Sequence, residues 1–153
     1  MQRLNLPTYS FNIKSEAGQD WIFDALRKKW LLLTPEEWVR QHFVRYLMED
    51  RGYPDSLIAI ERAVKISGRL LRFDLLVFSR SGVPWMLVEC KAPEVVINQL
   101  VFDQVSAYNL NLGAPYLVVT NGITHHCLEV GSGLPRGYRF LDHIPDFDFT
   151  EIH

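Results

Sequence analysis

Long uninterrupted apolar segments are missing from this sequence. No stretch approaches the roughly 20 apolar residues that a membrane-spanning helix needs, and the first 14 residues lack the apolar core of a secretory signal. Cysteine is scarce as well: Cys90 and Cys127 are the only two, and no Cys/His spacing typical of a metal site surrounds them. We therefore expect a cytoplasmic protein in a reducing compartment, with no membrane association and no need of a disulfide.

A surplus of positive charge is also missing. The chain has 16 Lys and Arg against 18 Asp and Glu, which gives a formal net charge of −2. This balance argues against a protein that coats nucleic acid through its overall charge, so any nucleic-acid contact must come from a local patch. A length of 153 residues with 48% hydrophobic content predicts one domain over residues 1–153, with an N-terminal arm of about residues 1–33.

The first third of the chain predicts one helix preceded by irregular structure. Residues 9–13 alternate as in a short edge strand, and residues 21–30 could form one or two helical turns. Thr34-Pro35-Glu36-Glu37 predicts a helix start, with Thr34 as N-cap and Glu37 at the capping-box position. Apolar residues then follow at helical spacing until Gly52 and Pro54 end the helix.

The rest of the chain predicts a mixed sheet flanked by helices, in the α/β (α+β) class. Strands are expected at 57–64, 70–78, 84–91, 116–120, 125–130 and 138–141, and a helix at 94–112. Residues 79–82 suit a hairpin turn, and the last two strands suit a second hairpin. The order strand, helix, strand over residues 84–120 predicts a parallel strand pair with a right-handed crossover.

Charged residues occur in the middle strands where apolar ones would be expected. Period-two alternation places Glu89 and Lys91 on one face of their strand, while Asp74 lies among apolar neighbours on the strand before it. An unpaired buried carboxylate is costly, so these groups must satisfy one another or hold something. One interpretation is a salt-bridge cluster in which Asp74 pairs with Arg72 or Lys91.

The other interpretation is an oxygen-ligand site for a hard cation. Mg²⁺ favours one or two carboxylates, several waters and substrate phosphate, so Asp74 and Glu89 could hold it, with the backbone carbonyl of Cys90 as a third ligand. Lys91 would then stabilise negative charge that develops during phosphodiester hydrolysis.

Asp74 followed by Glu89-Cys90-Lys91 resembles the D…ExK signature of PD-(D/E)XK nucleases. Two further segments resemble the N-terminal nuclease domain of type I restriction enzyme R subunits. Residues 36–40 resemble its E-x-x-[TV]-R helix, and residues 104–108 its Q-x-x-x-Y helix. The resemblance covers roughly residues 34–130 and implies a restriction-endonuclease-like fold.

The resemblance also implies roles for individual residues. Asp74 and Glu89 match metal ligands for Mg²⁺ or Mn²⁺, Lys91 matches the catalytic lysine, and Glu36 matches a carboxylate that supports the metal or its water. For Glu36 an ordinary i,i+4 pair with Arg40 is the alternative. Nucleic-acid contacts are expected from Gln104, Tyr108, Arg72 and Arg40.

Gln104 and Tyr108 continue the helical stripe of Ile97 and Val101, which predicts that this face packs against the sheet. The resemblance implies that the two polar residues hold the nucleic-acid backbone or the active-site hairpin. The alternative is a satisfied hydrogen bond in the core.

The resemblance therefore predicts a Mg²⁺-dependent DNA endonuclease of restriction, defence or repair, with partner proteins possible for target choice. The sequence has no phosphate-binding glycine loop, so we expect no helicase motor in it. A non-catalytic nucleic-acid-binding or assembly module that retains the nuclease fold is the alternative, which the near-neutral charge favours.

Overall fold

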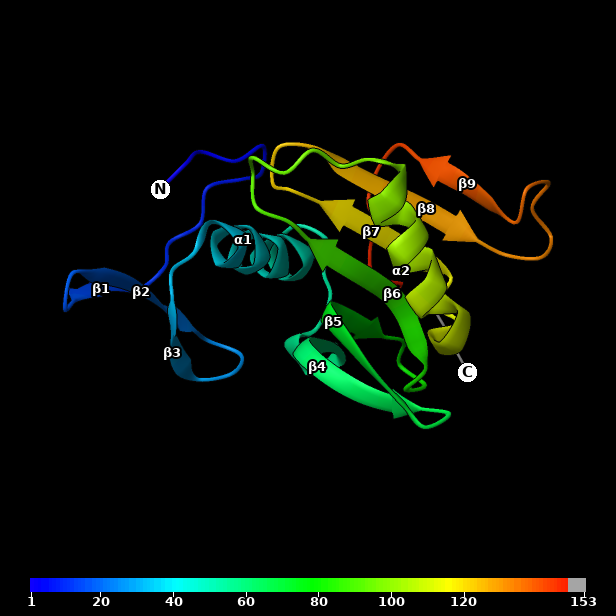
Figure 1. The fold of residues 1–153 in the computed structure, drawn as a ribbon, viewed down its shortest axis with the longest axis horizontal. Coiled ribbons are helices and arrows are strands. Elements are labelled where there is room, and N and C mark those ends of the chain that lie inside the picture. The colour runs from blue at the N-terminus through cyan, green and yellow to red at the C-terminus, as the bar shows by residue number, and fades with distance from the viewer. Residues whose placement is uncertain (149–153) are drawn as a thin grey trace.

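The computed structural model describes residues 1–148, apart from the side chains of Arg62, Val64 and Ile66. Its elements are, in chain order, β1 (Ile13–Glu16), β2 (Gln19–Asp24), β3 (Lys29–Leu32), α1 (Pro35–Glu49), a short 3₁₀ turn (Asp55–Leu57), β4 (Ile58–Ile66), β5 (Arg69–Phe78), β6 (Pro84–Cys90), α2 (Gln99–Leu112), β7 (Tyr116–Thr120), β8 (His125–Val130) and β9 (Tyr138–Leu141). Figure 1 shows their arrangement.

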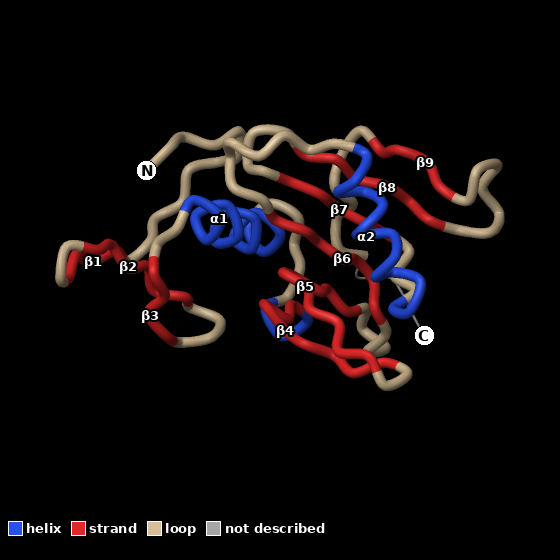
Figure 2. The backbone as a smooth tube through the Cα atoms, viewed as in Figure 1, coloured by secondary structure: helices blue, strands red, loops and turns tan. Residues whose placement is uncertain are grey.

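A six-stranded mixed sheet forms the body of the protein (Figure 2). Its strands lie in the order β4-β5-β6-β7-β8-β9, and β6 and β7 are parallel while every other neighbouring pair is antiparallel. The predicted α+β class is confirmed. The turn at 79–82, the parallel crossover and the second hairpin all occur where the sequence predicted them.

The two long helices pack against opposite sides of this sheet. Alternate strand residues Leu75, Val88 and Val118 belong to the core that includes α1 residues such as Phe43. Their sequence neighbours, among them Leu87, belong to a second core with α2 residues. Both faces of the central strands are therefore buried, which explains their nearly continuous apolar sequences.

Helix α1 begins as the sequence predicted. Thr34 is the N-cap, and its hydroxyl accepts a hydrogen bond of 3.0 Å from the backbone N–H of Glu37. The assignment of Glu37 as the reciprocal capping carboxylate was wrong. Its side chain is buried and bonds Arg40 and Gln41 instead, because these side chains lie on the same inward side of the helix.

Helix α2 is shorter than predicted and turned differently. It begins at Gln99 rather than residue 94, because the side chain of Asn98 caps the backbone N–H of Val101. The residues that face the sheet are Val101, Val105 and Asn109. The predicted stripe was therefore wrong for its polar members: Gln104 and Tyr108 lie exposed on the flank of the helix.

The N-terminal arm contains a three-stranded antiparallel meander, β1-β2-β3, which lies beside α1 (Figure 1). The prediction of helical turns at residues 21–30 was wrong. This segment forms β2, a turn and β3, because pairing with β1 and between the two strands satisfies its backbone. Before the meander, Leu4 enters the core of α1, and Asn5 donates its N–H to the carbonyl of Gly122.

The part of the chain that the structure describes contains no helix that is both long and apolar enough to cross a membrane.

Candidate functional site

The hairpin of β5 and β6 brings two of the predicted metal ligands together. The register pairs Leu75 with Val88, so one further step places Asp74 opposite Glu89. One oxygen of Asp74, Oδ2, accepts the backbone N–H of Cys90 at 2.8 Å. The carboxylate of Asp74 is therefore held where the pairing of β5 with β6 ends. There its negative charge lies close to that of Glu89.

Glu89 also contacts Lys91, as the predicted alternation requires. The Nζ of Lys91 lies 3.3 Å from Oε1 of Glu89, and both side chains are about three-quarters buried. Burial first, and the negative charge of Asp74 second, raise the pKa of Glu89 from 4.5 to about 7, although Lys91 opposes this. The raised pKa means that Lys91 alone does not compensate Glu89 for burial and for the negative charge of Asp74.

Glu36 and Arg40 approach the same carboxylates from α1. Glu36 is half-exposed and lies 3.7 Å from the guanidinium of Arg40, so the i,i+4 pair considered from the sequence is present. Burial and then the charge of Asp74 raise the pKa of Glu36 above its ordinary value. Asp74, Glu89, Lys91 and Glu36 thus share one region.

Arg40 is placed differently from the nucleic-acid contact expected of it. Its side chain is buried, and its Nη2 donates to Oδ1 of Asp74 at 2.8 Å. Although burial lowers it, the charges of Glu37 and Asp74 raise the pKa of Arg40 above its ordinary value. The salt-bridge partner of Asp74 is therefore Arg40, rather than the Arg72 or Lys91 considered from the sequence, because α1 places Arg40 beside Asp74 in the middle of β5.

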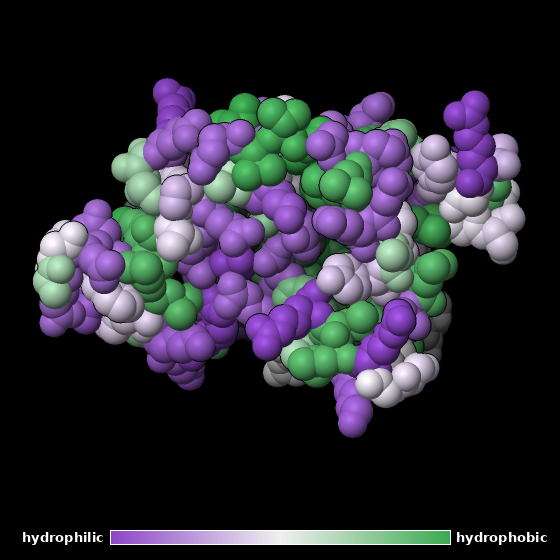
Figure 3. All heavy atoms as spheres, viewed as in Figure 1, coloured by the Kyte–Doolittle hydropathy of each residue, from purple (hydrophilic) through white to green (hydrophobic). Residues whose placement is uncertain are grey.

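A cleft of about 470 Å³ opens over these groups. Its lining includes three of the predicted carboxylates, together with Arg72 and Tyr108: Glu36, Arg40, Glu61, Ala63, Arg72, Phe73, Asp74, Glu89 and Tyr108. Figure 3 shows hydrophilic side chains gathered over the centre of this face, between the positions of α1 and α2 in Figure 1. Gln104 is exposed one helical turn before Tyr108 but does not line the cleft.

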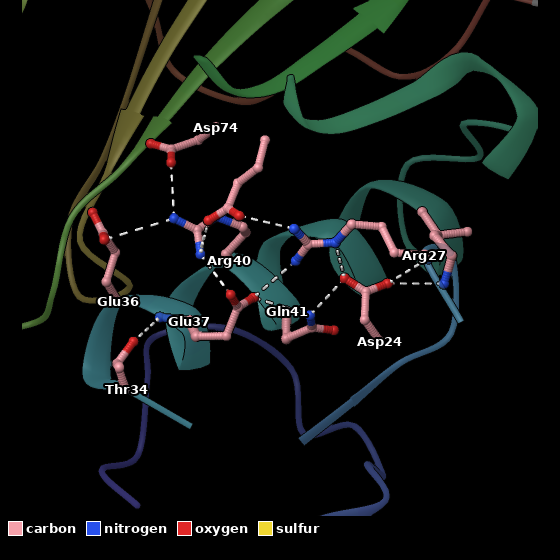
Figure 4. A network of polar contacts seen from close by, with 10 residues as sticks. Asp24, Arg27, Thr34, Glu36, Glu37, Arg40, Gln41 and Asp74 are labelled. Carbon is pink, nitrogen blue, oxygen red and sulfur yellow. Dashed lines mark hydrogen bonds and ion pairs between the residues drawn. The ribbon is translucent and has the colours of Figure 1, made fainter. Parts of the chain in front are cut away.

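Five residues of the surrounding charge network were not singled out for it from the sequence: Asp24, Arg27, Glu37, Gln41 and Glu61. Figure 4 shows how Asp24, Arg27, Glu37 and Gln41 connect to Arg40. Arg27 and Arg40 share the carboxylates of Glu37 and Glu61. The available signal was the position of Glu37 and Arg40 next to the apolar residues of α1. Charged residues there lie partly inside the protein and need partners of opposite charge.

Negative charge exceeds positive charge in this cluster. Its carboxylates are Asp24, Glu36, Glu37, Glu61, Asp74 and Glu89, and its cations are Arg27, Arg40 and Lys91. Even with the exposed Arg72 of the cleft included, carboxylates remain in excess. A cation in the cleft would relieve the repulsion between Asp74 and Glu89.

The residues present fit a hydrated magnesium site but not a closed protein cage. Among residues 1–148, no group of three or more His, Cys, Asp or Glu side chains is arranged to hold a metal ion. Mg²⁺ commonly takes only one or two carboxylates and completes its shell with waters and substrate phosphate. Asp74 and Glu89 supply such a pair, and each carboxylate oxygen retains a lone pair beyond the one used in a hydrogen bond.

Comparison with known proteins identifies the family of the chain and a solved structure with a similar fold. Residues 35–145 match the protein family described as type I restriction enzyme R protein N terminus. The fold resembles a solved fragment assigned to an HsdR subunit of a type I restriction enzyme from Vibrio vulnificus YJ016, with a TM-score of 0.52 and 22% sequence identity. That match covers 74% of this chain and 24% of the other chain, so the matched part corresponds to about a quarter of the solved fragment. No curated protein is significantly similar to the chain.

Proposed function

Because the chain belongs to the family of type I restriction enzyme R protein N-terminal domains, we propose that it is a Mg²⁺- or Mn²⁺-dependent nuclease domain that hydrolyses phosphodiester bonds in DNA. The observation that carries the proposal is the meeting of Asp74, Glu89 and Lys91 at the end of one hairpin, with Glu36 facing them from α1. Restriction, defence or repair is the setting that the family suggests, with partner proteins selecting the target.

Each group has a task in this proposal. Asp74 and Glu89 hold the cation with the backbone carbonyl of Cys90, and Glu36 orients water beside it. When bound, Mg²⁺ supplies Lewis-acid polarisation of a phosphoryl oxygen and makes nearby water more acidic. The ammonium of Lys91 stabilises the negative charge that grows on the phosphate in the transition state.

The groups around the cleft suit contacts to DNA rather than catalysis. Arg72 is exposed on the cleft rim, where a guanidinium can bind a phosphate. Tyr108 and Gln104 lie exposed on the flank of α2, so neither is committed to the core. Arg40 is buried among carboxylates, and we assign it to holding Asp74 instead of binding DNA.

A second function is favoured by one observation. Both oxygens of Asp74 accept hydrogen bonds from the protein itself, Oδ1 from Arg40 and Oδ2 from the N–H of Cys90. A domain that only binds nucleic acid or assembles with partners would need no more than this ion pair.

DNA cleavage by the purified chain tests the first function. Supercoiled plasmid should be cut with Mg²⁺ or Mn²⁺ and remain intact with EDTA. Lys91→Ala should abolish cutting and leave the thermal unfolding temperature within a few degrees, because Lys91 follows the end of β6. Lys14→Ala, a matched change on β1, should cut as the wild type does. Full metal-dependent cutting by Lys91→Ala would place the activity elsewhere.

A further inference from the structure

The turn between β2 and β3 presents a partly buried arginine, Arg27, to helix α1. Asp24 ends β2 with its side chain 1% exposed, and its Oδ1 accepts the backbone N–H groups of Leu26 and Arg27 at 2.9 and 2.8 Å. Its Oδ2 accepts Nε of Arg27 at 2.6 Å. The carboxylate therefore fixes both the turn and the direction of the Arg27 guanidinium.

Two carboxylates join Arg27 to Arg40. Glu61 lies 2.9 Å from a guanidinium nitrogen of each arginine, and Glu37 lies 3.5 Å from Arg27 and 2.8 Å from Arg40. Arg40 in turn bonds Asp74 at 2.8 Å. Figure 4 shows the resulting path from Asp24 in the meander to Asp74 in the cleft. Charges alternate in sign at every step along it.

This network is poorly explained by stability alone. Among the described residues, the Nε of Arg40 is buried without a hydrogen-bond partner, and the buried Nη2 of Arg27 has an ion pair with Glu37 at 3.5 Å but no hydrogen bond. Buried ion pairs are commonly no more stabilising than well-packed apolar residues, and unsatisfied donors add to their cost. Glu61 also has a φ of +42°, a strained value for a non-glycine residue, at the point where its carboxylate meets both arginines. Strain and unsatisfied donors of this kind are often found at functional sites, where side chains must be held in a fixed position.

We propose that Arg27 is a positioning residue of the cleft, which fixes Arg40 through Glu37 and Glu61 and thereby holds the Asp74 carboxylate in place. The family match begins at residue 35, so the meander adds to the site a part that the match does not contain. Only the use of Asp74 as a metal ligand rests on the proposed function. The path itself is a property of the folded chain.

The backbone N–H of Cys90 is a direct reporter of this path, because it donates to Asp74. In ¹H–¹⁵N spectra of the metal-free protein, Arg27→Gln should shift the Cys90 amide signal and speed its exchange with solvent. Arg45→Gln is the matched control: Arg45 lies on α1, the helix that carries Arg40, and it donates to the Ser10 carbonyl of the arm, outside the network. Its Cys90 signal should stay at the wild-type position.

Binding of Mn²⁺ alone, measured by calorimetry, provides the second readout. If Asp74 is a ligand, Arg27→Gln should weaken Mn²⁺ binding by roughly tenfold to hundredfold, as loss of a residue that orients a ligand does. Wild-type protein that binds no Mn²⁺ contradicts the metal site, while a shifted Cys90 signal in Arg27→Gln still supports the positioning path.

An unmoved Cys90 amide in Arg27→Gln overturns the positioning role, as does an equal shift in Arg45→Gln, which would mean that any loosening of the arm disturbs the cleft. If Arg27→Gln does not fold, Glu61→Gln weakens the same link by removing one of its two carboxylate charges from a half-exposed position, and it is judged by the same Cys90 signal.

Discussion

Replacing Asp74 with asparagine separates the two roles that its carboxylate has in this structure. Asparagine keeps the shape but offers one acceptor oxygen, so either Arg40 or the N–H of Cys90 meets an amide NH₂. Losing one charge-assisted hydrogen bond at this largely buried side chain should cost about 1.5–3 kcal/mol. Relief of the crowding with Glu89 opposes that loss.

The relief comes from Glu89, whose pKa is raised to about 7 by burial first and by Asp74 second. Removing the charge of Asp74 lowers the cost of ionising Glu89 and so offsets part of the lost hydrogen bond. The metal-free Asp74→Asn protein should therefore lose less than about 3 kcal/mol, a fall in unfolding temperature of less than about 12 °C.

Mn²⁺ should increase the difference in unfolding temperature between the wild type and Asp74→Asn. At a free concentration a hundred times Kd, binding stabilises the wild type by about 2.7 kcal/mol, or roughly 5–10 °C. Asp74→Asn should lose most of that gain, whereas Asp103→Asn, an exposed change on α2 away from the cleft, should keep it. Circular dichroism melts of the three proteins with EDTA and with Mn²⁺ measure both effects. A metal-indifferent wild type beside an Asp74→Asn protein destabilised by more than about 4 kcal/mol would mean that Asp74 serves only its ion pair.

Three further predictions concern other parts of the chain. Gln104→Ala and Tyr108→Phe should weaken DNA binding in fluorescence anisotropy while changing stability by less than about 0.5 kcal/mol, since both residues are exposed; unchanged affinity would remove them from the interface. Burial lowers the pKa of His42 below 6.5, so the folded state favours its neutral form. The free energy of unfolding should therefore be highest above about pH 6.5 and should fall as the pH drops through the lowered folded-state pKa. Urea titrations of His42→Gln should show a smaller fall, and a pH dependence identical to that of wild type would contradict this. Gly122→Ala should cost about 2 kcal/mol, because φ is +85° and the new Cβ would lie 2.8 Å from Leu4; a urea midpoint equal to that of wild type would refute it.

Local patterns were sufficient to predict much of the sheet and the carboxylate pair. Hairpin turn residues and period-two alternation fixed which residues share a face, and the strand pair carrying Asp74 and Glu89 follows from them. The start of α1 followed from Thr34 and Pro35, because capping is a short-range interaction.

Contacts between distant segments could not be predicted in this way. Arg40 and Asp74 are 34 residues apart, and nothing local to either indicates that they pair. The segment 21–30 has helix-compatible spacing, yet pairing within the meander and the turn fixed by Asp24 decide its structure. Tyr108 was assigned to the wrong side of α2, because the cap at Asn98 and the buried Asn109, which bonds Ala114, set the helix position.

Anomalous diffraction from crystals soaked in Mn²⁺ tests the metal site most directly. We expect a peak between Asp74 and Glu89, about 2.1 Å from a carboxylate oxygen of each, with the backbone carbonyl of Cys90 and water completing the shell. Crystals that show no peak there, with Asp74 still bonded to Arg40 and to the N–H of Cys90, would contradict it.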